Sequence, residues 1–198
     1  MSFLPKNYTI PENNSNSKYL NPSKLEEGKP TRFRILSKAL LGWSYWTNEN
    51  KPVRLKLEDY PKTTPPDIQV REGKAKINHF WAIIVYNYNT EQLEIFEIPQ
   101  KTIQLQLKNY FDDADYGDPF NYDFKITRTG QELETKYSII ATPPKPFDPV
   151  LKNKVLKEGL NDIKLEKLLT GDNPFEEVNE SEEITEEEHP DTFVNMTF

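Results

Sequence analysis

Aromatic residues that could stack on flat ligands gather in two segments of the chain. One segment spans residues 43–46 and the other spans residues 80–88. Proteins that bind single-stranded nucleic acids use such side chains as platforms for bases, and each stack contributes about 1–3 kcal/mol whatever the base. The candidate stacking residues are Trp43, Tyr45, Trp46, Phe80, Trp81, Tyr86 and Tyr88.

Basic residues accompany these aromatic residues on the same predicted strands. In a single-strand binder, a cationic groove holds the phosphates while the aromatic faces hold the bases. The candidate phosphate-binding residues are Arg32, Arg34, Arg54, Lys56, Lys76, Lys125, Arg128 and Lys136.

The same residues could instead serve packing and solvation, and the sequence leaves both readings open. A small β-domain needs aromatic side chains in its core, and a basic residue on a strand can simply face water. Alternation separates the two readings only in part. In the segment YDFKIT at 122–127, Tyr122, Phe124 and Ile126 are predicted to face inward, whereas Asp123 and Lys125 are predicted to face outward.

Motifs for catalysis or metal binding are missing from the sequence. It contains no glycine-rich phosphate loop, no paired-histidine motif and no nucleophile elbow. Cysteine is absent, and His79 and His189 are far apart. The acidic run at 112–118 lacks the spacing and the terminal glutamate of a calcium loop, so we interpret it as a solvated loop. We expect no catalytic residue, no metal and no cofactor.

Charge is distributed unevenly along the chain. The net charge is −7, but residues 172–198 contain ten Asp/Glu and no Lys/Arg, which leaves 25 basic and 22 acidic residues in the remainder. A mildly basic body with an acidic end indicates a nucleic-acid surface and an interaction tail. Residues 172–198 are therefore predicted to be an acidic disordered tail, and the Asn/Ser/Pro-rich residues 1–27 a flexible N-terminal arm.

Hydrophobic periodicity predicts one β-rich domain with one or two helices. In residues 31–37, Phe33 and Ile35 are predicted inward and Arg32 and Arg34 outward. Further strands are expected at 40–46 and 53–57, hairpins at 79–98 and 122–140, and a helix at 99–111 with Thr102 as a candidate N-cap. This order matches an OB-fold, a five-stranded, partly open Greek-key barrel, over residues 28–147. Residues 148–171 are predicted to form a C-terminal helical segment that begins with Asp148 and Pro149.

Several stretches of the sequence resemble the single-stranded DNA-binding protein family of bacteriophages. The similarity is carried by Gly28–Ser37 with Gly42–Trp46, Lys51–Arg54 with His79–Tyr86, Glu94–Ile103, and Gly117–Pro119 with Tyr122–Gly130 and Thr135–Tyr137. The segment Gly171–Phe175, followed by an acidic run and a terminal aromatic residue, is similar to the partner-binding tail of such proteins. The chain departs from some phage relatives in having no zinc ligands, and its last residues, Asn195–Phe198, are less acidic than the usual tip.

The resemblance implies a protein that coats and protects single-stranded DNA during phage replication, recombination and repair, without a cofactor or covalent chemistry. Its tail would recruit a polymerase, primase or helicase, with Phe193 and Phe198 docking into the partner. Self-association on DNA is left open.

The sequence also bears on location and on competing functions. Its first residues lack the apolar region of a signal peptide, and no apolar run approaches the ~20 residues of a membrane span, so we expect a cytoplasmic protein without a membrane partner. Two alternatives stay open. One is an RNA-binding OB-fold regulator, since stacking and phosphate contacts serve both nucleic acids. The other is an adaptor or structural protein that binds no nucleic acid.

Overall fold

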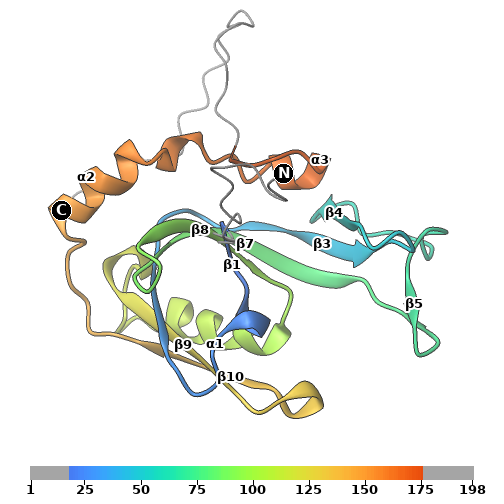
Figure 1. Cartoon of the computed structure of the whole chain (residues 1–198), viewed down its shortest axis with the longest axis horizontal. Helices are drawn as coiled ribbons and strands as arrows, with labels where there is room; N and C mark the ends of the chain where they lie inside the picture. The colour runs from blue at the N-terminus through green and yellow to red at the C-terminus, as the bar shows by residue number, and fades with distance from the viewer. Residues whose placement is uncertain (1–17, 176–198) are drawn as a thin grey trace, which may run out of the picture.

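The computed structural model describes residues 18–175, which are built mostly from one strongly curved β-sheet (Figure 1). In this part of the chain the sheet has eight strands, and a separate ribbon contains β5 (Val70–Arg71) and β6 (Lys74–Ala75). The strands of the main sheet are β1 (Tyr19–Leu20), β2 (Thr31–Ile35), β3 (Leu40–Trp46), β4 (Pro52–Lys56), β7 (Asn78–Asn87), β8 (Gln92–Ile98), β9 (Asp123–Thr129) and β10 (Lys136–Ala141).

Strand β2 lies at the centre of the sheet and pairs antiparallel with both β7 and β9. The order across the sheet is β1-β8-β7-β2-β9-β10, and β3 pairs with β7 and β4. Both predicted hairpins are confirmed, because β7 pairs with β8 and β9 pairs with β10.

The inner face of the sheet holds an aromatic core under helix α1 (Lys101–Asp112). The Phe33 ring stacks on Phe124 with centroids 5.6 Å apart and meets Phe96 edge-on at 5.3 Å. From α1, Ile103 and Leu107 are fully buried against this core. The predicted inward positions of Phe33 and Phe124 are therefore confirmed. The N-cap of α1 is Gln100 rather than Thr102, because the helix begins at Lys101 and places Thr102 in its first turn.

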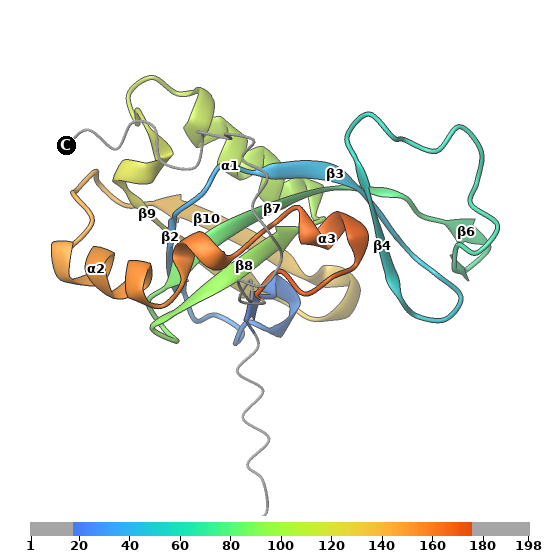
Figure 2. The same ribbon diagram turned by 90° about the horizontal axis from the view of Figure 1, so that it is seen from above.

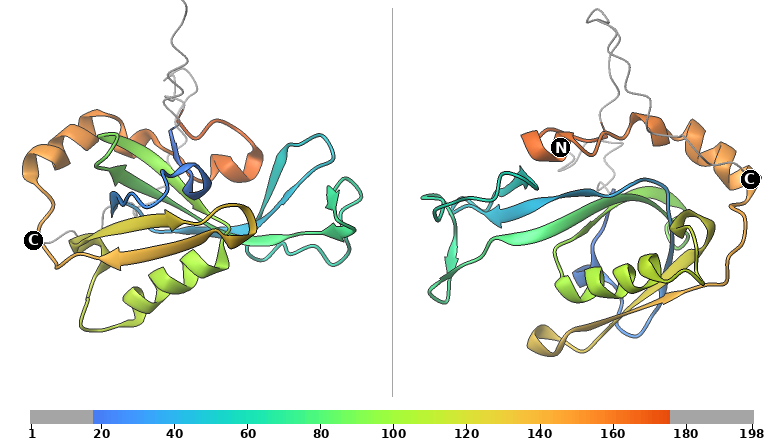
Figure 3. Two further views of the ribbon diagram at one scale, coloured as in Figure 1. Left: turned by 60° about the horizontal axis from the view of Figure 1, so that its bottom comes forward. Right: turned by 180° about the vertical axis from the view of Figure 1, so that it is seen from behind.

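The sheet does not close into a barrel, since β8 and β10 do not pair. Helix α1 lies between these strands (Figure 3). Two of its side-chain amides hydrogen-bond to the backbone of β8 and β10 where a strand would otherwise pair. Gln104 Nε2 donates to the carbonyl of Ile98 at 2.7 Å. Gln106 Nε2 donates to the carbonyl of Tyr137 at 2.9 Å, and Gln106 Oε1 accepts from the Ile139 amide at 2.8 Å. Two glutamines thus satisfy backbone groups that a closed barrel would pair through its ladder.

The outer face of the sheet is covered by residues 142–175, which we call the cover segment (Figure 1). It contains α2 (Pro149–Lys157), a short turn of 3-10 helix at Leu160–Asp162, and α3 (Lys167–Thr170). The predicted start of α2 is confirmed, because the Asp148 carboxylate accepts from the Val150 amide at 2.7 Å. The buried side chains of the cover segment pack on Phe80, Ile84, Tyr86 and Ile95 of the sheet. These side chains are Phe147, Val155, Leu160, Ile163, Leu165 and Leu168.

Both predicted terminal boundaries move outward in the structure. Residues 18–27 were expected in a flexible arm, but Tyr19 and Leu20 pair in parallel with Ile95 and Phe96 of β8. Residues 172–175 were expected in the tail, yet Pro174 is buried and its carbonyl accepts from the Lys164 amide at 3.0 Å. Residues 1–17 and 176–198, including Phe193 and Phe198, lie outside the described residues.

Candidate nucleic-acid interface

An arm projects from one end of the sheet, as Figure 2 shows. We define it as residues 40–79, which comprise β3, β4, the β5–β6 ribbon and the start of β7. Gly42 is required where β4 curls over β3. A Cβ atom at this position would lie 2.2 Å from the Leu55 carbonyl oxygen and 2.9 Å from a Phe80 ring atom. A larger side chain at position 42 would therefore displace β4 or the Phe80 ring.

An aromatic cluster of Trp43, Tyr60 and His79 lies on the arm. The Trp43 ring meets Tyr60 at 4.7 Å and His79 at 5.2 Å, both in edge-on geometry. Trp43 Nε1 also donates to the Leu57 carbonyl at 2.9 Å, so this indole anchors the chain that follows β4. Tyr60 remains 52% exposed. Trp43 thus has a packing role, and Tyr60 presents its ring to solvent.

Exposed apolar side chains are concentrated on the arm. Trp46 is 52% exposed. Five of the ten exposed large hydrophobic residues in the described chain lie between residues 41 and 70. Because exposed apolar side chains are more frequent here than in the rest of the described chain, the arm is the candidate region for a ligand contact. The five residues are Leu41, Trp46, Leu57, Tyr60 and Val70.

The arm also carries lysines without ionic partners. Residues 40–79 contain seven Lys/Arg and five Asp/Glu. Lys56, Lys62, Lys74 and Lys76 are exposed, and none of them forms an ion pair with another residue in the range 18–175. Their charges are available to phosphates. Lys56 and Lys76, which were predicted to bind phosphates, are thus accessible to solvent.

Arg54, on β4, forms a bidentate ion pair with Glu97 of β8. Its Nε and Nη2 atoms lie 3.0 and 2.7 Å from the two carboxylate oxygens. Both side chains are largely buried, at 14% and 21% exposure. The pair neutralises the guanidinium, so Arg54 does not offer a net charge to a phosphate as the sequence analysis expected.

Arg34 is the clearest correction among the predicted phosphate contacts. Its side chain is 1% exposed and forms a buried ion pair with Asp123, which was predicted to face outward and is fully buried. Arg34 Nη1 also donates to the carbonyls of Phe120 at 3.3 Å and Lys145 at 3.2 Å. The outer face is not solvated here because the cover segment lies over it. Arg34 therefore binds protein rather than DNA.

Arg32 and Tyr88 belong to the same network. Arg32 Nε donates to Asp123 Oδ2 at 2.8 Å, and its guanidinium lies 4.5 Å from the centre of the Tyr88 ring. The Tyr88 hydroxyl donates to Asp123 Oδ1 at 3.1 Å. The Arg32 side chain is 36% exposed, so it retains partial access to solvent. Both residues hold the junction of β2, β7 and β9 together.

The network predicts a loss of stability at high pH. Burial, with the Asp123 carboxylate adding to it, raises the pKa of the Tyr88 hydroxyl from 10.0 to about 12. Since the folded pKa exceeds the unfolded one, the neutral phenol contributes stability that is complete below about pH 10 and is lost as the pH rises toward 12. Chemical denaturation across this range should show a smaller decline for Tyr88→Phe than for the parent chain. An identical decline in both would contradict the assignment.

Four predicted stacking residues serve mainly as packing. Phe80 and Tyr86 are 0% and 1% exposed beneath the cover segment, and Tyr45 is 8% exposed with its hydroxyl 3.3 Å from Asp67 Oδ1. Trp81 is half-buried beside Phe111, with ring centroids 6.3 Å apart. The first three are not accessible to a base, because protein covers their rings.

The remaining basic candidates lie on β9 and β10, across α1 from β7 and β8 (Figure 1). Lys125 and Lys136 are exposed, whereas Arg128 Nε donates to the Leu25 carbonyl at 2.8 Å. The structure therefore does not bring all the predicted site residues together. It leaves exposed aromatic residues and lysines along the arm, and separate cations on the β9–β10 hairpin.

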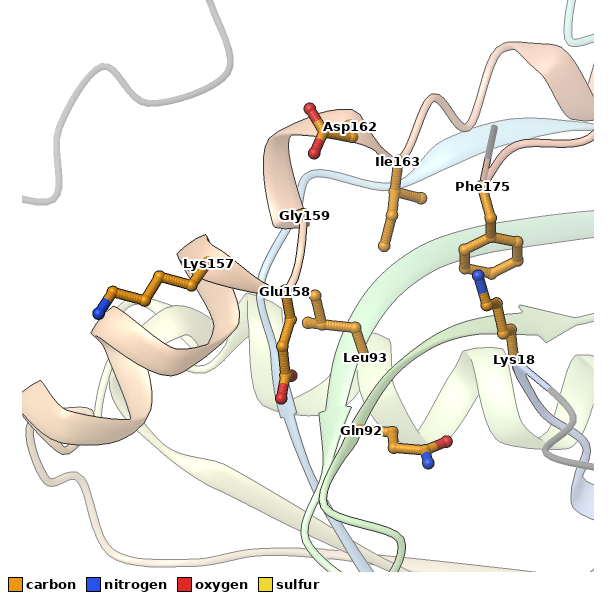
Figure 4. Close-up of a pocket in the computed structure, with 9 residues that line it drawn as sticks. All are labelled: Lys18, Gln92, Leu93, Lys157, Glu158, Gly159, Asp162, Ile163 and Phe175. Carbon is orange, nitrogen blue, oxygen red and sulfur yellow. The ribbon is translucent and has the colours of Figure 1, made fainter. Parts of the chain in front are cut away.

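Two hollows flank the base of the arm and the cover segment. One, of about 350 Å³, is lined by residues of β1, β3, β4, the start of β7 and the end of β8, including Tyr19, Trp46 and Arg54. The other, of about 390 Å³, lies between the sheet and the cover segment. Figure 4 shows Lys18 close to Phe175 at its edge, and the Lys18 amine lies 4.9 Å from the centre of that ring. Glu158 and Asp162 line the second hollow together with Lys18 and Lys157, so charges of both signs meet there.

Tyr60 is the arm residue that the sequence analysis missed. It lies in the proline-containing excursion after β4, where periodicity gives no signal. Its presence in a long loop with Lys62 nearby was the available indication, because long loops in compact domains are often functional.

Comparisons with protein-family models, curated proteins and solved structures find no match to this chain. The described residues contain no group of three His, Cys, Asp or Glu side chains that could hold a metal ion. Within residues 18–175, no helix has the length and apolar character needed to cross a membrane.

Proposed function

We propose that this chain is a single-stranded DNA-binding protein of the bacteriophage replication type, which coats and protects DNA strands in the cytoplasm of the host cell. The observation that carries the proposal is the arm, where exposed Trp46 and Tyr60 accompany four lysines without ion pairs. Stacking platforms beside free cations are the combination that sequence-tolerant binding of single strands requires. The protein acts by binding alone, without a cofactor.

The strand order supports an OB-like architecture for this function. The central strand β2 pairs with both β7 and β9. In the sequence, helix α1 lies between the β7–β8 hairpin and the β9–β10 hairpin. OB-folds bind oligonucleotides with similar strand arrangements. In this proposal α1 occupies the gap between β8 and β10, so the barrel is an open variant.

The arm is the favoured interface because the cover segment occupies the outer face of β7 and β8. Phe147 and Leu160 lie over Tyr86 and Ile84 there, in a continuous apolar cluster. Displacing the cover segment would expose that cluster to water. A strand can reach Trp46 and Tyr60 without this cost.

Binding should depend on salt and tolerate any sequence. Each phosphate neutralised by a lysine contributes about −0.7 to the slope of log affinity against log salt concentration. If the four unpaired arm lysines each hold one phosphate, we expect a slope near −3 for an oligo-dT ligand, measured by fluorescence anisotropy.

Matched DNA and RNA oligonucleotides separate the proposal from its alternatives. Preference for the RNA would favour an RNA-binding regulator. Absence of binding at low salt would remove the proposal and leave the adaptor function.

The acidic residues beyond Phe175 are proposed to recruit a replication protein and to compete weakly with DNA for the arm. Residues 176–198 contain nine of the ten carboxylates in 172–198, whereas residues 1–171 have a small basic excess. Because Pro174 and Phe175 pack on the folded part, the informative truncation begins at Glu176. Deletion of residues 176–198 should strengthen DNA binding at low salt and abolish capture of a polymerase, primase or helicase. Unchanged affinity would exclude competition, and retained capture would exclude recruitment.

A further inference from the structure

The hollow between the arm and the β1–β8 edge, which we call the notch, has the size of a small-ligand site. Its volume is about 350 Å³, at the lower end of the roughly 300–1,000 Å³ typical of ligand pockets. A space of this volume holds many water molecules and is large enough for a single heterocyclic ring. The notch opens beside Trp46, whose indole is 52% exposed.

The floor of the notch is close to electrically neutral. Arg54 and Glu97 line it as a bidentate pair with N–O distances of 3.0 and 2.7 Å. Burial raises the pKa of the neighbouring Tyr19 hydroxyl, with Arg54 opposing and Glu97 adding to the effect, so this phenol stays uncharged at neutral pH. A phosphate gains little from such a floor, because the guanidinium is already neutralised.

Uncharged polar groups complete the lining. Asn78 is exposed, and its side-chain amide makes no hydrogen bond to other residues within 18–175. Gln100 also lines the notch, and its Oε1 atom is buried without a partner in the described chain. A side-chain amide presents one donor and one acceptor side by side, which is the pattern that pairs with the polar edge of a base.

We propose that the notch binds one nucleobase of the bound strand, with Trp46 stacking on the ring and Asn78 contacting its polar edge. The inference rests on the proposed function. Lysines on the outside of the arm hold the phosphates, while the neutral notch takes the base. Gln100 accepts from an amino group or ring N–H of that base after rotation of its side chain.

Cross-linking of the full chain to an oligo-dT that contains 5-iodouracil tests where the base lies. Peptide mass spectrometry should find the cross-link at Trp46 or Tyr19. Cross-links confined to Tyr60, or to residues outside the arm, overturn the notch and leave DNA binding intact. An oligonucleotide that the parent chain does not bind at low salt overturns the proposed function itself.

Affinity measurements test the two contacts separately. Trp46→Ala should weaken binding of oligo-dT roughly 5- to 150-fold, which corresponds to one lost base–aromatic stack. The same variant should bind an abasic strand of equal length as the parent chain does. Asn78→Ala should weaken binding of oligo-dT roughly 2- to 12-fold, whereas Asn109→Ala, an exposed asparagine on α1, should have no effect. Equal affinities for the two asparagine variants, or equal losses of Trp46→Ala on both strands, would contradict a base in the notch.

Discussion

Replacement of Asp123 by alanine is expected to lower the free energy of unfolding by about 3–5 kcal/mol, the usual cost of breaking a buried ion pair from one side. Asp123 is fully buried and forms ion pairs with Arg34 and Arg32. The Arg32 side chain can turn to solvent, but Arg34, at 1% exposure, cannot. Urea unfolding followed by circular dichroism measures the loss.

Two further variants locate the cause of this loss. Arg34→Met should cost less, because Asp123 keeps Arg32 and the Tyr88 hydroxyl as partners. Asp115→Ala, a carboxylate on the exposed loop after α1, should change stability by no more than about 0.5 kcal/mol. If Asp123→Ala also falls within that small range, the Arg34 charge is solvated in the folded state and the network does not hold β2 to β9.

The second large effect is expected for DNA binding. In the Trp46→Ala/Tyr60→Ala double variant, both exposed platforms on the arm are removed, and the loss of two stacks amounts to about 2–6 kcal/mol in binding free energy when the losses add. Stability should change little, since each ring is 52% exposed. Anisotropy titration with oligo-dT at low salt measures the loss, and circular dichroism verifies the fold.

A matched control separates platform loss from general loss of apolar surface. Leu133 and Ile140, at 102% and 58% exposure, lie on the β9–β10 side of the molecule. The Leu133→Ala/Ile140→Ala double variant should bind as the parent chain does. Equal binding by both double variants would mean that the arm is not the interface.

Alternation along the sequence predicted the inner face well. Phe33, Phe124 and Ile126 are all fully buried there. Successive side chains of a strand point to opposite faces of the sheet, so the local sequence is enough to predict which ones share the inner face. The other face could not be predicted in the same way. Arg34 and Tyr86 were predicted to face solvent or DNA, but residues from 142 onward pack over them. Periodicity within one strand cannot predict burial by a segment so far along the chain.

The candidate site was predicted at the level of the segment rather than of the residue. The crowding of Trp43, Tyr45 and Trp46 pointed to β3 as the candidate segment, but only tertiary packing separates the anchored Trp43 and buried Tyr45 from the exposed Trp46. Glu97 is 43 residues from Arg54, so a partner that neutralises the arginine was not visible from local sequence. Tyr60 escaped notice because its loop has no regular period.

The hydrogen bonds that α1 makes to β8 and β10 also affect how copies of this protein can associate. An open sheet edge with unpaired backbone groups is a template for strand addition and aggregation. Here the Gln106 side chain hydrogen-bonds to the Tyr137 carbonyl and the Ile139 amide of β10, and β1 pairs with Ile95 and Phe96 of β8. The protein can therefore remain an incomplete barrel without offering these groups to a second chain. If copies of this protein lie side by side on one DNA strand, as the proposed function implies, contacts at these two edges would therefore be made by side chains rather than by strand addition, and such contacts can separate again when the strand is released.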